Sequence, residues 1–365
     1  MKDLKIAFLL EEFALQTPAQ QLLDRFLIGY PRDGEFHKPE GMQVTAHLAS
    51  GETNAELDRR VKDYGLVREQ EAGAAAAQAN ALVIVPRGSG ATANESLIRH
   101  ALEKAPAGCC CFVYGALSNS LDAAKKVMEL AAARKSRLCA GTSLPATWRL
   151  PDVDLQPGTP LPEALIVVHG TPPAAELDGL EGLWPVIERR RNGESGIQCV
   201  QFFKGDALWQ TGRDRVWSWP LLAAAISRSD SPQGDPVKDG RTQNLAGLGL
   251  VPGLARDPRG WVLQHRDGLK STILVLDGVI ADYSFAVQAG DGTVTSAQLY
   301  RPPAPAQHQF SRLAAVLEDF YQTGKPPWPV ERNVLIAGLL ETFRDASLRA
   351  GERVETPALG IAYGR

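Results

Sequence analysis

The fold is decided by residues 81–114, whose sequence is ALVIVPRGSGATANESLIRHALEKAPAGCCCFVY. An apolar run at 81–86 is followed by a helical pattern at 94–104 and by a second apolar run at 109–114. Continuous apolar runs separated by a helix are typical of parallel strands that helices cover on both faces of a sheet. This stretch therefore predicts a strand–helix–strand unit of a parallel α/β sheet.

The same alternation extends outward over the first 149 residues. Further strands are expected at 5–10, 42–49 and 136–140, and further helices at 18–28, 54–64, 71–79 and 121–134. Thr17 and Pro18 supply a cap and a first-turn proline for one of these helices. Gly65 permits a left-handed end for another. We therefore expect a Rossmann-like domain over residues 1–149.

The pattern changes at residue 163, after which the apolar runs are longer and alternate more. Strands are expected in EALIVVH (163–169), IQCVQFFKGDALW (197–209), GWVLQHRDGLKSTILVLDG (260–278) and VIADYSFAVQA (279–289). The short turn at 266–268 favours antiparallel pairing. Helices are expected at 177–191, 219–228, 308–322 and 330–349, with a long irregular loop at 229–259.

These runs predict a second domain over residues 150–365, an α+β domain with a large open, mostly antiparallel sheet flanked by helices. Its boundary with the first domain is expected in the proline-bearing stretch at 144–162. The C-terminal helix at 330–349 is expected to pack back toward the domain interface.

Charge and composition exclude several classes of protein. The 365 residues include 39 basic and 42 acidic side chains, and a formal charge of −3 does not favour nucleic acid or an anionic membrane as a partner. The first apolar run ends at Glu11 and Glu12 and is too short for a signal peptide, and no later stretch approaches the roughly 18 apolar residues of a membrane span. Five cysteines without regular spacing predict neither a disulfide framework nor a metal site. We expect a cytoplasmic protein without a metal.

The order of elements resembles the Gfo/Idh/MocA family of sugar and cyclitol dehydrogenases. Three stretches carry the resemblance: 58–105, 117–149 (LSNSLDAAKKVMEL and onward), and 323–359, which closes on Glu-Thr-Pro. The resemblance implies a dinucleotide domain followed by a sheet domain, NAD or NADP as cofactor, and oxidoreductase activity on a sugar-like or cyclitol-like small molecule. It also implies a homo-oligomer assembled through the C-terminal sheet.

The family's three chemical motifs are absent where they are expected. A dinucleotide needs glycines in the first strand-to-helix turn, so that backbone N–H groups can approach its pyrophosphate. Here that turn is EEFALQTPAQ (11–20), which has no glycine and brings two carboxylates. Tyr114-Gly115-Ala116 stands in place of Glu-Lys-Pro, and the helix expected to carry Asp-x-x-x-His has Asp178 but no histidine. These departures argue against standard NAD(P) chemistry.

One glycine pattern remains as a candidate cofactor site. The stretch from Gly88 to residue 93 has the spacing Gly-x-Gly-x-x-Ala, and it lies between an expected strand and an expected helix. Pro86, Gly88 and Gly90 are therefore candidate cofactor-binding residues. The alternative is a flexible turn at the start of a helix.

The candidate catalytic residues are His169, Asp178 and Tyr114. His169 ends the 163–169 strand just before Gly170, where a sheet delivers side chains into a cleft, and imidazole titrates near neutral pH. The alternative is a strand-end histidine whose hydrogen bonds a neighbour satisfies. His265, in the middle of a strand, is expected to be structural.

Six further residues are candidates for substrate binding: Arg149, Lys204, Asp206, Trp209, Trp217 and Arg228. Tryptophans at 209, 217 and 219 could line a sugar pocket, because indole rings combine an apolar face with a polar N–H. Packing beneath a long loop explains them equally well. Arg149 suits a carboxylate or phosphate, or alternatively an interdomain ion pair. The sequence therefore leaves two functions open: a divergent oxidoreductase, or a non-catalytic binding or assembly protein that retains the fold.

Overall fold

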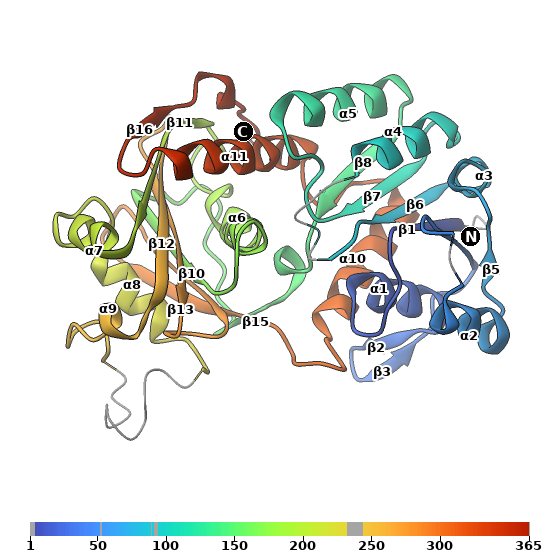
Figure 1. Ribbon diagram of the computed structural model, residues 1–365, viewed down its shortest axis with the longest axis horizontal. Helices are drawn as coiled ribbons and strands as arrows, with labels where there is room; N and C mark the ends of the chain where they lie inside the picture. Colours follow the sequence, from blue (N-terminus) through green and yellow to red (C-terminus); the bar gives the residue numbers. More distant parts are fainter. Residues whose placement is uncertain (1–3, 52, 89, 91–93, 232–243, 365) are drawn as a thin grey trace. The chain divides into compact units, whose positions relative to one another are not determined.

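A computed structural model describes residues 4–51, 53–88, 90, 94–231 and 244–364 (Figure 1). The chain forms two units, one of residues 1–146 and 301–337, the other of residues 147–300 and 338–365. The segment 301–337 therefore groups with the first unit, whereas the sequence-based division assigned it to the second. The long helix α11 (Val330–Leu348) begins in the first unit and continues into the second.

The first unit contains a six-stranded sheet whose paired strands are all parallel, in the order β5-β4-β1-β6-β7-β8. Its strands are β1 (Leu4–Leu10), β4 (Met42–Leu48), β5 (Val67–Arg68), β6 (Ala81–Val85), β7 (Cys110–Tyr114) and β8 (Arg137–Gly141). Strand order reverses between β1 and β6, as in a Rossmann fold. The predicted parallel sheet is confirmed.

Helices cover both faces of this sheet. They are α1 (Pro18–Leu27), α2 (Ala55–Tyr64), α3 (Ala72–Gln78), α4 (Glu95–Lys104), α5 (Leu121–Ala133) and α10 (Gln309–Thr323). Ile6, Phe8 and Leu10, which alternate along β1, share one buried cluster with apolar side chains of α1 and α10. The Thr17 hydroxyl caps α1 by accepting a hydrogen bond from the Gln20 N–H, and Gly65 ends α2 in the left-handed region (φ 70°).

Two buried polar contacts attach the segment around α10 to the first unit. The Arg25 guanidinium of α1 donates to the carbonyls of Ala306 and Gln307, at 2.9 and 3.2 Å. The Tyr30 hydroxyl, in the small hairpin of β2 (Tyr30–Arg32) and β3 (Glu35–His37), donates to Glu318 at 2.7 Å. These contacts lie far apart in sequence, and local periodicity could not assign α10 to the first unit.

The second unit contains an eight-stranded sheet in the order β16-β11-β12-β13-β10-β14-β15-β9. Its strands are β9 (Trp148–Leu150), β10 (Glu163–Val168), β11 (Ile197–Lys204), β12 (Arg256–His265), β13 (Lys270–Asp277), β14 (Tyr283–Gln288), β15 (Val294–Tyr300) and β16 (Arg353–Glu355). Every pairing is antiparallel except that of β10 with β13. The mostly antiparallel sheet is confirmed.

The sequence predicted a strand over 197–209, but the structure has two elements there. Strand β11 ends at Lys204, and helix α7 (Gly205–Arg213) follows at once. Leu208 and Trp209 are both buried in this helix, whereas a strand would have placed these neighbours on opposite faces. Apolar residues resume directly after Lys204-Gly205-Asp206, which concealed the change from a period of two to a period of 3.6.

Both faces of the second sheet carry helices near β10. Alternate β10 residues Leu165 and Val167 share a buried cluster with α8 (Trp219–Ile226) and α9 (Val251–Leu254). On the other face α6 (Ala174–Ile187) packs so closely that a Cβ added at Gly182 would lie 2.7 Å from the Ile166 side chain. The homo-oligomer that assembles through this sheet stays a prediction. Where two copies met near β10, these helices would form the contact.

Three further expectations concern the loop, the cysteines and membrane-spanning segments. Residues 232–243 of the loop expected at 229–259 lie outside the described residues, and α9 and the start of β12 occupy its last part. All five cysteines are buried free thiols. Among the described helices, none combines the length and apolar character that a membrane span requires.

Candidate functional site

The turn between β1 and α1 is the place where a Rossmann fold holds a pyrophosphate. In this chain Glu11 and Glu12 bind the adjacent turn that follows β6. The Arg87 N–H donates to Glu11 Oε2 at 2.9 Å, and the Gly88 N–H donates to Glu12 Oε1 at 2.7 Å. The Asn94 side-chain amide, which caps α4, also donates to Glu11. Two carboxylates thus occupy N–H donors at the topological switch point.

The residues present here do not fit a dinucleotide held in the usual way. A pyrophosphate would bring negative charge beside the two carboxylates, which would repel it. The turn also lacks a glycine that would let its backbone approach the ligand closely. The Phe13 side chain that follows is 4% exposed and packs in the buried apolar cluster of the first unit.

The predicted glycines at 88 and 90 both have a positive φ, which favours glycine, and a close approach of two turns further restricts Gly90. Gly90 lies in the left-handed region (φ 81°), and its carbonyl accepts a hydrogen bond from the Ala116 N–H at 2.8 Å. A Cβ at Gly115 would come within 2.1 Å of that carbonyl oxygen. The two turns therefore approach too closely for side chains. Pro86 is buried, and residues 89 and 91–93 of the predicted pattern lie outside the described residues.

Tyr114 belongs to the same crossing of turns in the first unit. It ends β7, is 6% exposed, and lies 6.0 Å from the Phe310 ring of α10 between ring centroids. A Cβ at Gly90 would lie 3.0 Å from its ring. These contacts with Phe310 and Gly90 give Tyr114 a packing role. They do not support its predicted catalytic role, which stays a prediction.

His169 and Asp178, the other predicted catalytic residues, are brought together in the second unit by Tyr283. The His169 ring follows β10 and lies 5.1 Å from the Tyr283 ring of β14, between centroids. The Tyr283 hydroxyl donates to the Asp178 carboxylate of α6 at 2.9 Å. His169 and Asp178 are half-buried. We call His169, Asp178 and Tyr283 the β10-end trio.

The trio can do acid–base chemistry. A carboxylate that accepts a hydrogen bond from Tyr283 orients the phenol, and the His169 imidazole beside it has ring nitrogens that can exchange a proton with a hydroxyl group. Tyr283 was not predicted from sequence, because the pairing of β14 with β10 and the packing of α6 on this sheet together bring it to Asp178. Four positions after Asp178 stands Gly182, where the close packing of α6 leaves no room for a histidine.

A second carboxyl group on α6 was also missed. Glu176 is 4% exposed, and burial raises its pKa to about 7, although Arg259 and Arg344 act in the opposite direction. Residues at 176, 180, 183 and 187 form the apolar stripe of α6. A glutamate within such a stripe is the sequence signal that could have identified it, because carboxylates are rarely buried without a partner.

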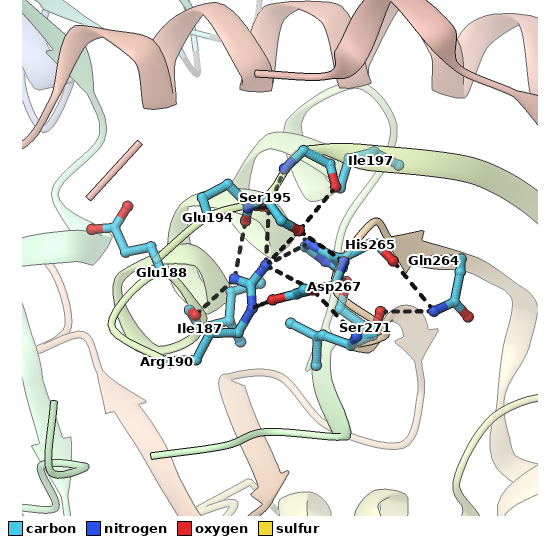
Figure 2. A network of polar contacts seen from close by, with 12 residues as sticks. Ile187, Glu188, Arg190, Glu194, Ser195, Ile197, Gln264, His265, Asp267 and Ser271 are labelled. Atoms are coloured by element: carbon cyan, nitrogen blue, oxygen red, sulfur yellow. Dashed lines mark hydrogen bonds and ion pairs between the residues drawn. The ribbon is translucent and has the colours of Figure 1, made fainter. Parts of the chain in front are cut away.

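A buried polar network of the second unit joins the segment after α6 to the turn between β12 and β13 (Figure 2). Arg190 donates to Glu194 at 3.1 Å and to Asp267 at 2.7 Å, and Glu194 lies 3.0 Å from His265 Nδ1. The other nitrogen of His265 lies 2.8 Å from the Ser271 hydroxyl. The side chains of Arg190, Glu194 and His265 are at most 2% exposed. This burial suits a structural network, the role predicted for His265.

Arg149 is held in an ion-pair cluster within the second unit. Its guanidinium contacts Asp154 at 3.3 Å, and Arg189 binds the same carboxylate. Burial lowers the pKa of Arg149. Arg149 therefore forms an ion pair, as in the alternative interpretation, but its partner Asp154 lies in the same unit and not in the other one.

The remaining predicted substrate residues fall into two groups. Trp209 and Trp217 gather around Trp219, at centroid distances of 6.1 and 5.4 Å. Lys204 and Asp206 are exposed at the start of α7, and Arg228 donates to the Ser296 hydroxyl at 2.9 Å. Trp217 and Trp219 line a cavity of about 760 Å³ at the start of α8, and the other four residues do not. Among the described residues, no cluster of histidine, cysteine or carboxylate side chains could hold a metal.

Comparison with solved structures identifies the fold. A myo-inositol dehydrogenase from Lactobacillus casei, in complex with NAD(H) and myo-inositol, matches with a TM-score of 0.58 and 12% identity, over 100% of this chain and 98% of its own. A biliverdin reductase from Synechocystis, in complex with biliverdin and NADP+, matches with a TM-score of 0.52 and 14% identity, over 96% and 100% of the two chains. A probable dehydrogenase from Thermotoga maritima matches with a TM-score of 0.58 and 10% identity, over 98% and 100%.

The chain therefore shares the two-domain fold of these solved structures. This is the fold of the Gfo/Idh/MocA type, and the resemblance noted in the sequence is confirmed at the level of fold. No protein-family model and no curated protein matches the sequence.

Proposed function

We propose that this chain is a divergent protein of the Gfo/Idh/MocA fold that binds a sugar-like or cyclitol-like molecule without using the dinucleotide site of its fold relatives. One observation carries the proposal. Glu11 and Glu12 bring two carboxylates to the glycine-free turn where a Rossmann fold holds a pyrophosphate, and the backbone N–H groups of Arg87 and Gly88 hold these carboxylates in place. The turn therefore presents negative charge where the ligand would place its own.

The β10-end trio supports a polyol as the ligand. A phenol, an imidazole and a carboxylate at one strand end can exchange hydrogen bonds with neighbouring hydroxyl groups of a sugar or cyclitol. Solved relatives in fold include inositol dehydrogenases and a UDP-N-acetylglucosamine 3-dehydrogenase. In the proposed role Asp178 orients Tyr283, and His169 contacts the ligand.

The same trio favours a second candidate function, an oxidoreductase that holds its cofactor by other contacts. His169 would then remove or return the proton of the reacting hydroxyl group. The two candidates differ in one measurable property. Only the oxidoreductase reduces a dinucleotide when a polyol is supplied.

Calorimetric titration with myo-inositol, scyllo-inositol and glucose, paired with absorbance at 340 nm in the presence of NAD+ or NADP+, tests both candidates. We expect saturable binding of at least one polyol, at least tenfold weaker binding in His169→Ala, and no absorbance change. His100→Ala, which alters an exposed histidine of α4, is the matched control. Growth of absorbance at 340 nm would favour the oxidoreductase, and absence of polyol binding would refute the proposal.

A further inference from the structure

A cavity in the second unit lies away from the β10-end trio. Its volume is about 760 Å³, within the range of small-molecule sites. Glu163, which begins β10, lines the cavity, whereas His169 follows the last residue of the same strand. A strand of this length spans about 20 Å. The cavity and the trio are therefore at opposite ends of β10.

The apolar part of the cavity is an indole surface. Trp219 is half-buried and lines the cavity; Trp217 stacks on it at 5.4 Å between centroids and 24° between ring planes. The Trp219 Nε1–H donates to the Ala246 carbonyl at 3.1 Å, and the Trp217 Nε1–H donates to the Leu208 carbonyl at 3.0 Å. Both indoles are thus fixed in position, and Trp219 presents a rigid aromatic surface to a ring-shaped ligand.

The polar part of the cavity is cationic. Arg213 and Arg215 line it from the end of α7 and the residues after it. In the described part of the chain, the Arg215 guanidinium makes no hydrogen bond or ion pair, and the Arg213 guanidinium is bound only to the Gln210 amide oxygen. Glu163 also lines the cavity, but Lys270 neutralises it at 2.5 Å. The cavity therefore favours a negatively charged ligand.

One further group completes a binding site for hydroxyl groups. The Gln288 side chain, at the end of β14, lines the cavity and has no hydrogen-bond partner among the residues described. Its amide can both donate to and accept from a hydroxyl group. We propose that this cavity binds a sugar or cyclitol that carries a carboxylate or phosphate, with the ring on Trp219 and the anion on Arg215.

This inference does not depend on the proposed function, because its residues and its end of β10 are different. The probes are glucuronate and glucose 6-phosphate, with glucose and inorganic phosphate as partial ligands, all measured by calorimetry. We expect the wild-type chain to bind at least one anionic sugar at least tenfold more tightly than glucose and than phosphate alone. Which of the two it prefers identifies the anion.

Four variants locate the binding. Arg215→Gln and Trp219→Leu should each weaken binding of the preferred probe at least tenfold. Arg191→Gln, an exposed arginine of the same unit that lines no part of the cavity, should not change it. His169→Ala should not change it either, which separates this site from the trio.

The inference is overturned by any of three results. The first is that neither anionic sugar binds more tightly than glucose. The second is that inorganic phosphate binds as tightly as glucose 6-phosphate. The third is that Arg215→Gln retains wild-type affinity for the preferred probe. If Trp219→Leu unfolds the chain, Arg215→Gln alone decides, because Arg215 is exposed and its replacement removes no buried contact.

Discussion

Replacement of Glu176 by glutamine should stabilise the second unit at alkaline pH. Glu176 is 4% exposed, and burial raises its pKa from 4.5 to about 7. The folded state therefore holds its proton more tightly than the unfolded state does. Between pH 4.5 and 7 the unfolded chain loses this proton first, so the free energy of unfolding falls as the pH rises through that window.

The magnitude follows from the pKa values. Each tenfold change in acid dissociation corresponds to about 1.4 kcal/mol, so ionised Glu176 costs about 3 kcal/mol of stability above pH 8. Glutamine has nearly the same shape and no charge. We expect Glu176→Gln to match the wild-type chain within about 1 kcal/mol at pH 4.5 and to exceed it by about 3 kcal/mol at pH 8.

Urea unfolding followed by tryptophan fluorescence is the assay. All seven tryptophans except Trp328 belong to the second unit, so the signal reports chiefly on that unit. Glu352→Gln, at an exposed glutamate of the same unit, controls for the loss of a negative charge. A difference between Glu176→Gln and wild type that stays constant from pH 4.5 to 8, or that reverses sign, would refute the reasoning.

Two further predictions concern backbone packing and acid stability. Gly115→Ala should destabilise the first unit by at least about 2 kcal/mol, because φ at this position is 90° and the new Cβ would meet the Gly90 carbonyl. Urea unfolding followed by circular dichroism measures this change, and unchanged stability would contradict the prediction. Burial alone would raise the pKa of Glu194, but His265 and Arg190 outweigh it and hold the pKa at about 2. The stability that ionised Glu194 contributes is present above pH 4.5 and is lost as the pH falls toward 2. In Glu194→Gln the free energy of unfolding, measured by urea unfolding, should therefore depend less on pH in that window.

The sequence predicted most of the first unit because its elements are locally specified. Continuous apolar runs at 81–86 and 109–114 became β6 and β7, and the helix between them was expected within one residue of its bounds. The change from β11 to α7 at Lys204 was missed, because apolar residues resume after Asp206 and α7 is too short for its helical period to be evident in the sequence.

The sites were less predictable because they depend on contacts between distant segments. The sequence showed that Glu11 and Glu12 bring charge to the first turn. It could not show that their carboxylates bind the N–H groups of Arg87 and Gly88, which lie 76 positions away. Tyr283 joined His169 and Asp178 for the same reason, since strand register decides which side chains meet.

Direct titration of the wild-type chain with NAD+, NADH, NADP+ and NADPH by calorimetry tests the central claim, that the carboxylates of Glu11 and Glu12 in the first strand-to-helix turn prevent dinucleotide binding to the first unit. The account predicts no saturable heat with any of the four up to millimolar concentration. Saturable binding in the micromolar range, at about 8 kcal/mol of binding free energy, would contradict it.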